Sequence, residues 1–112
     1  MINILGDKLE YLDLQYKTEI SNDLINKIGY LAPNIKELNL ASTNIDSNVI
    51  IELGKSCKSL EAIDISLCHK LEEEAILSFL RDNNRLKKFS ANHLENAITD
   101  ACLEALGNSE EL

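Results

Sequence analysis

Apolar residues recur along the chain in a short frame, at its first, fourth and sixth positions. The clearest copy is LEAIDISLC, residues 60–68. Successive copies start 26, 25, 26 and 26 residues apart. The last of these starts, at Leu112, is the first residue of an incomplete copy. Because apolar and polar positions alternate in the frame, each copy predicts a short strand with one buried face. The four full copies start at Leu9, Ile35, Leu60 and Leu86.

A second pattern fills the remainder of each repeat. Apolar residues recur there at steps of three and four, which predicts a helix with one buried stripe. Acidic residues lie near the starts of these stretches and basic residues near the ends, as the helix macrodipole favours. Pro33 and Gly107 follow the first and last stretches, where helices commonly stop. The predicted helices cover residues 20–31, 45–57, 71–80 and 98–106.

A fixed period of 25–26 residues with an L-x-x-L-x-L core is the signature of a leucine-rich repeat. The predicted fold is α/β, a right-handed solenoid of about four repeats with a curved parallel sheet inside and helices outside. Residues 1–112 are expected to form a single domain with a partial repeat at each end. Neither end has an evident polar cap, so we expect either a segment of a longer solenoid or a partner that covers the ends.

The composition narrows the function. The chain has a net charge of −8 and a sequence pI of about 4.7, so phosphate backbones repel it and no nucleic-acid partner is expected. Its longest apolar run is a few residues, which argues against membrane insertion, and no secretory signal follows Met1. Three cysteines and no Asn-x-Ser/Thr site favour a reducing compartment, taken here as the cytoplasm. A ciliary, nuclear or mitochondrial complex is left open.

Residues 57–68, with the sequence CKSLEAIDISLC, resemble the cysteine-containing class of leucine-rich repeats, whose frame is C-x-x-L-x-x-L-x-L-x-x-C. Residues 98–106 resemble the I-T-D-like helix start of that class. The class includes substrate-recognition arms of F-box ubiquitin-ligase subunits and accessory subunits of ciliary and mitochondrial assemblies. Two departures are that only repeats two and three carry the class cysteines, and that Phe89 and Ala91 replace leucine in frame four. We expect the latter to distort that repeat.

The polar frame positions define a candidate partner-binding surface. In a strand, side chains alternate between faces, so the second, third, fifth and seventh positions are expected on the exposed, concave side. Repeats one to three lean acidic there, which indicates a protein partner with a basic segment. The candidate residues are Glu10, Tyr11, Asp13, Gln15, Lys36, Glu37, Asn39, Glu61, Asp64, Ser66, Lys87, Lys88 and Asn92.

Motifs that would indicate a specific chemistry are less well supported than this binding surface. Residues 54–56 (GKS) end like a phosphate-binding loop, but the glycine required five residues before Gly54 is replaced by Val49. The cysteines and histidines offer no C-x-x-C pair for zinc, so Cys57 and Cys68 are expected as buried thiols. The acidic run 72–74 fits a helix start better than acid–base chemistry. We therefore expect no catalytic site, no metal and no cofactor.

The sequence thus predicts a non-enzymatic protein–protein interaction module. It would be a scaffold or accessory subunit in a larger assembly, binding through the concave sheet face and the solenoid ends. Unsealed ends also predict end-to-end self-association of the isolated chain. The alternative is the substrate-recognition segment of an F-box-type ubiquitin ligase. An enzyme would require a deep pocket with a perturbed acid–base pair.

Overall fold

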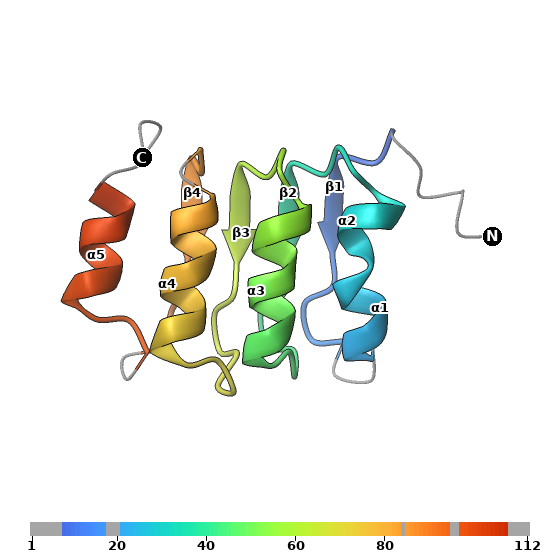
Figure 1. The fold of residues 1–112 in the computed structure, drawn as a ribbon. Helices are drawn as coiled ribbons and strands as arrows, with labels where there is room; N and C mark the ends of the chain where they lie inside the picture. The colour runs from blue at the N-terminus through green and yellow to red at the C-terminus, as the bar shows by residue number, and fades with distance from the viewer. Residues whose placement is uncertain (1–7, 18–20, 84, 95–96, 108–112) are drawn as a thin grey trace.

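A computed structural model describes residues 8–17, 21–83, 85–94 and 97–107 of the chain. It is a mixed α/β fold in which short strands alternate with helices (Figure 1). A strand forms in each of the four frames, as the apolar pattern predicts. The strands are β1 (Tyr11–Asp13), β2 (Glu37–Asn39), β3 (Ala62–Asp64) and β4 (Lys88–Ser90). The helices are α1 (Asn22–Asn26), α2 (Ile28–Leu31), α3 (Ser47–Ser56), α4 (Glu73–Asp82) and α5 (Asp100–Gly107).

The four strands form one parallel sheet in the order β1-β2-β3-β4. Its register follows the frame position by position, since residues one repeat apart are Cα partners. The fourth position makes this plain, because its apolar residues pair across the whole sheet. The pairing continues to Phe89, so the distortion expected in the fourth repeat is absent from the strand register. The paired fourth-position residues are Leu12, Leu38, Ile63 and Phe89.

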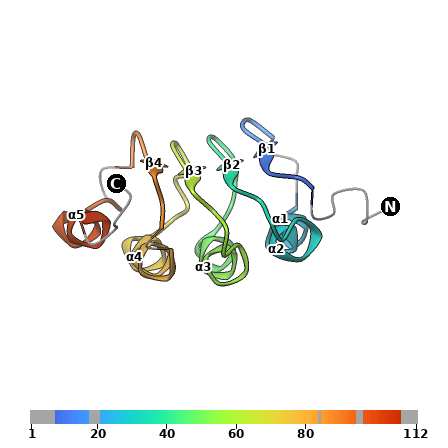
Figure 2. The same cartoon turned by 90° about the horizontal axis from the view of Figure 1, so that it is seen from above.

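The helices form a second row along one side of the sheet (Figure 2). Successive helices contact one another: α1 and α2 contact α3, α3 contacts α4, and α4 contacts α5. Each repeat is therefore held by its neighbours on both layers, the strands through hydrogen bonds and the helices through side-chain packing. No helix among the described residues has the length and apolar character needed to cross a membrane.

The first predicted helix, 20–31, is broken into two. Ser21 caps α1 through its hydroxyl, which accepts from the Leu24 N–H at 3.2 Å. The chain then tightens at Lys27, whose N–H bonds to the Leu24 carbonyl at 3.0 Å, and α2 begins at the next residue. The three- and four-residue apolar steps continue through the break, so the sequence pattern does not reveal it.

The core lies between the two layers. Apolar frame positions of the two middle strands are buried, with Leu38 2% exposed and Ile63 3% exposed. All three cysteines are free and buried, which confirms the buried thiols predicted at Cys57 and Cys68. In the outer repeats Leu86 is buried, with 1% exposed, and the other apolar frame positions are only half-buried: Leu9, Leu12, Leu14, Phe89 and Ala91. These positions have a neighbouring strand on one side of the described sheet.

Candidate partner-binding surface

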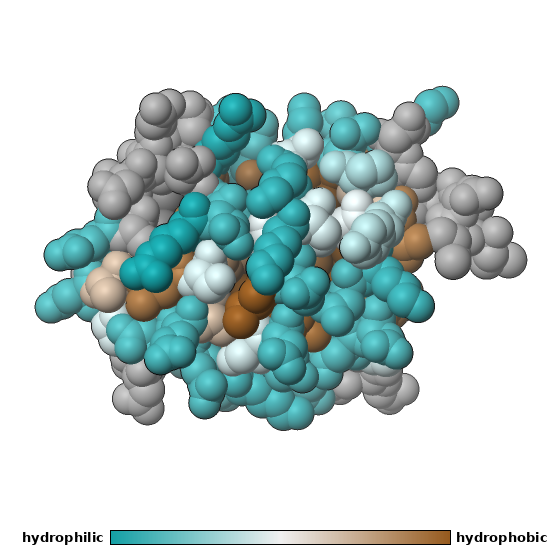
Figure 3. Space-filling view, in the orientation of Figure 1, coloured by the Kyte–Doolittle hydropathy of each residue, from teal (hydrophilic) through white to brown (hydrophobic). Residues whose placement is uncertain are grey.

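The candidate surface is the side of the sheet that faces away from the helices, which we call the open sheet face (Figure 2). The opposite, helix-bearing side is mostly hydrophilic, with small apolar areas between the helices (Figure 3). Parallel pairing in register brings the same frame position of each repeat into a row across the sheet. The predicted surface residues therefore fall into four rows, and the structure gives each row a different role.

The charged side chains of the second-position row pair with one another. Its charges alternate from strand to strand, and the structure shows two ion pairs within it. Glu10 and Lys36 approach to 3.9 Å, and Glu61 and Lys87 to 3.7 Å. Pairs this exposed are screened by water and add little to stability. Their consequence for binding is that this row presents balanced charges that are already paired with one another.

In the fifth-position row, three side chains form hydrogen bonds with the backbone. The side-chain oxygens of Asp13, Asn39 and Asp64 each accept from the N–H two residues further on, at 3.0, 3.0 and 2.9 Å. These Asx turns end each strand and start the chain back toward the helix layer. An Asp or Asn at the same place in three frames was the available signal for this role.

In each repeat, the residue three positions after the fifth frame position has a left-handed backbone conformation. Its φ lies between 59° and 66° in all four repeats, although none of the four is glycine. Non-glycine residues rarely adopt this conformation, so each must be held by the surrounding turn. The Asx hydrogen bonds supply that constraint in the first three repeats. The residues are Tyr16, Ser42, Leu67 and His93.

The seventh-position row corrects the prediction for one residue. Ser66 was expected to be exposed, but it is buried with 6% of its surface exposed. Its hydroxyl accepts from the Asn92 N–H at 2.9 Å, which joins the turns of repeats three and four. Ser66 closes the Asx turn of Asp64 with its own N–H, at the point where β3 has ended. The alternation of buried and exposed side chains therefore ends one residue before the seventh frame position.

The third-position row is the one left open. It consists of Tyr11, Glu37, Ala62 and Lys88, which are successive Cα partners across the four strands. Glu37 and Lys88 are exposed, and Tyr11 has 55% of its surface exposed. Among the described residues no side-chain hydrogen bond or ion pair involves Glu37 or Lys88. This third-position row therefore retains the side chains that the fold does not use.

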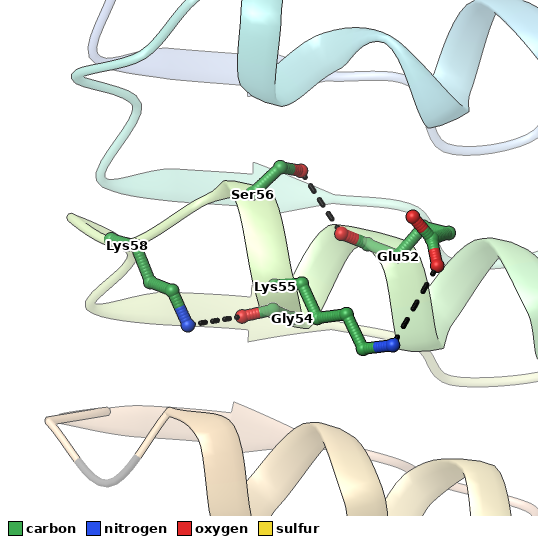
Figure 4. A network of polar contacts seen from close by, with 5 residues as sticks. All are labelled: Glu52, Gly54, Lys55, Ser56 and Lys58. Carbon is green, nitrogen blue, oxygen red and sulfur yellow. Dashed lines mark hydrogen bonds and ion pairs between the residues drawn. The ribbon is translucent and has the colours of Figure 1, made fainter.

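The phosphate-loop resemblance at 54–56 lies at the carboxyl end of α3 (Figure 4). There the Gly54 carbonyl accepts from Lys58 Nζ at 3.3 Å, and the Ser56 hydroxyl donates to the Glu52 carbonyl at 3.0 Å. Lys55 pairs with the Glu52 carboxylate at 3.9 Å. A helix end that presents carbonyls attracts cations and repels phosphate, so these contacts stabilise the end of the helix.

The two histidines line a hollow with mixed polar and apolar walls. The described residues contain no group of three or more Cys, His, Asp or Glu placed to hold a metal ion. Burial raises the pKa of Cys57 to about 11 and also raises that of Cys68, so both stay protonated near neutral pH. The hollow, of about 460 Å³, is lined by His69, Leu71, Glu72, Glu73, His93, Leu94 and Ala97.

Comparison with known proteins supports a leucine-rich-repeat-related fold. No family model matches the chain. It is 28% identical over 96 residues to F-box/LRR-repeat protein 5 of Mus musculus, covering 83% of this chain and 14% of that protein. The Xenopus tropicalis protein of that name is 33% identical over 73 residues, covering 64% of this chain and 11% of that protein. The chain thus spans a small part of these relatives.

Two solved structures share the arrangement of strands and helices. The leiomodin-1 actin-binding site 2 structure has a TM-score of 0.73 at 16% identity, covering 96% of this chain and 67% of that one. The Caenorhabditis elegans tropomodulin C-terminal domain has a TM-score of 0.77 at 18% identity, covering 99% and 74%. At such identities the similarity concerns the fold alone.

Proposed function

We propose that this chain is a segment of a right-handed leucine-rich-repeat solenoid that works as a non-enzymatic protein–protein interaction module. It acts as a scaffold or accessory subunit in a larger cytoplasmic assembly and binds a protein partner on the open sheet face. The observation that carries the proposal is the third-position row. There an aromatic ring and two charged side chains are exposed in register, and none of them forms a side-chain hydrogen bond or ion pair within the described residues.

The structure changes the charge that we propose for the partner segment. Three fifth-position side chains form Asx turns, and the second-position charges pair with one another. Among the charged side chains of these rows, Glu37 and Lys88 are the two that form no hydrogen bond or ion pair within the described residues. We therefore propose a partner segment with both charges in place of a purely basic one.

The second candidate function is substrate recognition for an F-box-type ubiquitin ligase. The observation in its favour is the sequence similarity to F-box/LRR-repeat protein 5 over most of this chain. A different observation supports protein binding in general, since the leiomodin-1 structure with this fold is an actin-binding site. Both candidates use the same open sheet face.

A comparison of two double variants in affinity capture tests the proposal. Tyr11→Ala with Glu37→Lys alters the third-position row, and Tyr30→Ala with Glu104→Lys makes matched changes at exposed positions of α2 and α5. The full chain is expressed in its native cell and its bound proteins are quantified by mass spectrometry. The proposal expects partners lost from the first variant and retained by the second, with equal circular dichroism spectra. Equal retention by both would contradict it.

A further inference from the structure

We infer that the third-position row binds an α-helix of the partner protein, laid across the four strands and carrying opposite charges two helical turns apart. The inference rests on the proposed function and adds to it the secondary structure and charge pattern of the partner segment. It follows from three properties of the row: its spacing, its unpaired charges and the small side chain at its centre.

The spacing follows from the strand register. Glu37 pairs with Ala62 and Ala62 pairs with Lys88, so Glu37 and Lys88 lie two strands apart. Neighbouring strands are about 4.8 Å apart, which puts these two residues about 10 Å apart along a line that crosses the sheet. A partner segment must therefore present two side chains on one face at that separation.

An α-helix meets this separation and an extended strand does not. Residues seven apart in a helix are two turns apart on the same face, and the rise of about 1.5 Å per residue separates them by about 10.5 Å. A strand presents same-face side chains about 6.6 Å and about 13 Å apart, which brackets the required distance without matching it. The row therefore fits positions i and i+7 of a helix.

The charges assign the helix side chains. Glu37 and Lys88 form no ion pair among the described residues, whereas their second-position neighbours do. A basic residue at position i would face Glu37 and an acidic residue at i+7 would face Lys88. The second-position row is balanced, so its charges do not cancel this pattern.

The remaining two residues of the row supply the apolar contacts. Ala62 lies between the charges and is half-buried, so its small side chain leaves room for an apolar residue at i+3 or i+4. Tyr11 lies one strand beyond Glu37 on the other side, about 5 Å away, which is the reach of position i−3 or i−4. Tyrosine is enriched among residues that carry interface energy, so Tyr11 is the anchor of the proposed contact.

Selection from two phage-displayed libraries tests the inference. One library randomises one face of a stable helical scaffold, and the other randomises one face of a β-hairpin scaffold. Both are selected on the full chain and on its Glu37→Lys and Lys88→Glu variants, with Glu104→Lys as the matched charge control on α5.

The inference expects enrichment from the helical library, with a basic residue and an acidic residue seven positions apart. Selection on Glu37→Lys is expected to yield acidic residues at both positions, and selection on Lys88→Glu basic residues at both. Individual binders should lose about five- to tenfold in affinity when the facing charge is reversed, and be unchanged on Glu104→Lys. Each binder's affinity is measured by fluorescence anisotropy.

Three results would overturn the inference: no enrichment of helices, hairpin binders in their place, or helices whose affinity ignores residues 37 and 88. If affinity capture still shows a partner that depends on the row, the proposed function survives and only the helix is rejected. If the partner also ignores the row, the proposed function fails with it.

Discussion

Asp64 is a carboxylate that the sequence places on a binding surface and the structure assigns to the backbone. One of its oxygens accepts from the Ser66 N–H at 2.9 Å and holds the turn that follows β3. The turn leads to Leu67, whose φ of 63° is unusual for a residue with a branched side chain. At the residue scale, therefore, exposure alone does not identify a binding residue, because the hydrogen bonds already made decide what is left for a partner.

The Asx turn gives a stability prediction at Asp64. Asp64→Ala removes the acceptor and should lower the free energy of unfolding by about 1–2 kcal/mol, typical of a lost side-chain cap. Asp64→Asn keeps an acceptor oxygen and should lose less than about 0.5 kcal/mol. Urea unfolding followed by circular dichroism measures both. Equal losses in the two variants would show that the hydrogen bond does not hold the turn.

The buried thiol of Cys57 gives a pH prediction. Burial raises its pKa from 9.0 to about 11, so the folded chain holds this proton more tightly than the unfolded chain. The stabilisation is complete below pH 9 and is lost as the pH rises through about 11. Between pH 8.5 and 10.5, about the window set by these values, the unfolding free energy should fall more steeply for the natural chain than for Cys57→Ala. Parallel slopes in urea titrations of the two proteins would contradict the assignment.

At the scale of elements, the apolar periods predict that strands and helices exist and roughly where. They miss features that depend on neighbouring repeats. The break at Lys27 is one, since the apolar stripe runs through it unchanged. Buried Asn83 is another, because its Nδ2 donates to the carbonyls of Gly54 and Phe79 at 3.2 and 2.9 Å, linking α4 to the end of α3. In the sequence, an asparagine near a helix end is interpreted as a solvent-exposed stop signal. Its contact with the neighbouring helix becomes visible only in the structure.

Gly29 shows how closely the broken helix approaches its neighbour. A Cβ at this position would lie 2.2 Å from Ser56 Oγ and 2.9 Å from the Ser56 carbonyl carbon. Gly29→Ala should therefore lower the free energy of unfolding by about 1–3 kcal/mol, as overpacking does. At Gly54 the added Cβ would be 3.1 Å from its nearest neighbours, Asn83 Nδ2 and Phe79 Cδ1, so Gly54→Ala is the milder control. Thermal and urea melts measure both.

A rescue variant separates this clash from a general effect of alanine in α2. Ser56→Gly removes the side-chain atoms that the new Cβ would meet, and only the backbone contact remains. Combined with Gly29→Ala it should restore part of the lost stability relative to Ser56→Gly alone. If the two changes are simply additive, the proposed contact is not the cause.

At the scale of the whole molecule, the repeat period predicts the parallel sheet, its register and the helix layer, because equivalent residues must pair with one another. Leu38 and Ile63 are buried as the frame requires. The binding surface was harder to predict, because the sequence does not show which polar side chains already have partners within the fold. The ion pairs of Glu10 with Lys36 and of Glu61 with Lys87 appear only once the strands are adjacent.

Site-specific photocrosslinking shows directly whether the open sheet face binds a protein partner. A photoreactive amino acid is placed at position 37 or 88 of the third-position row, or at position 74 or 104 on the helix-bearing side. Exposed residues occupy all four positions. In cells, irradiation should yield a discrete adduct with the same partner from positions 37 and 88 and none from 74 and 104. An adduct from the helix positions alone, or equal adducts from all four, would contradict the account.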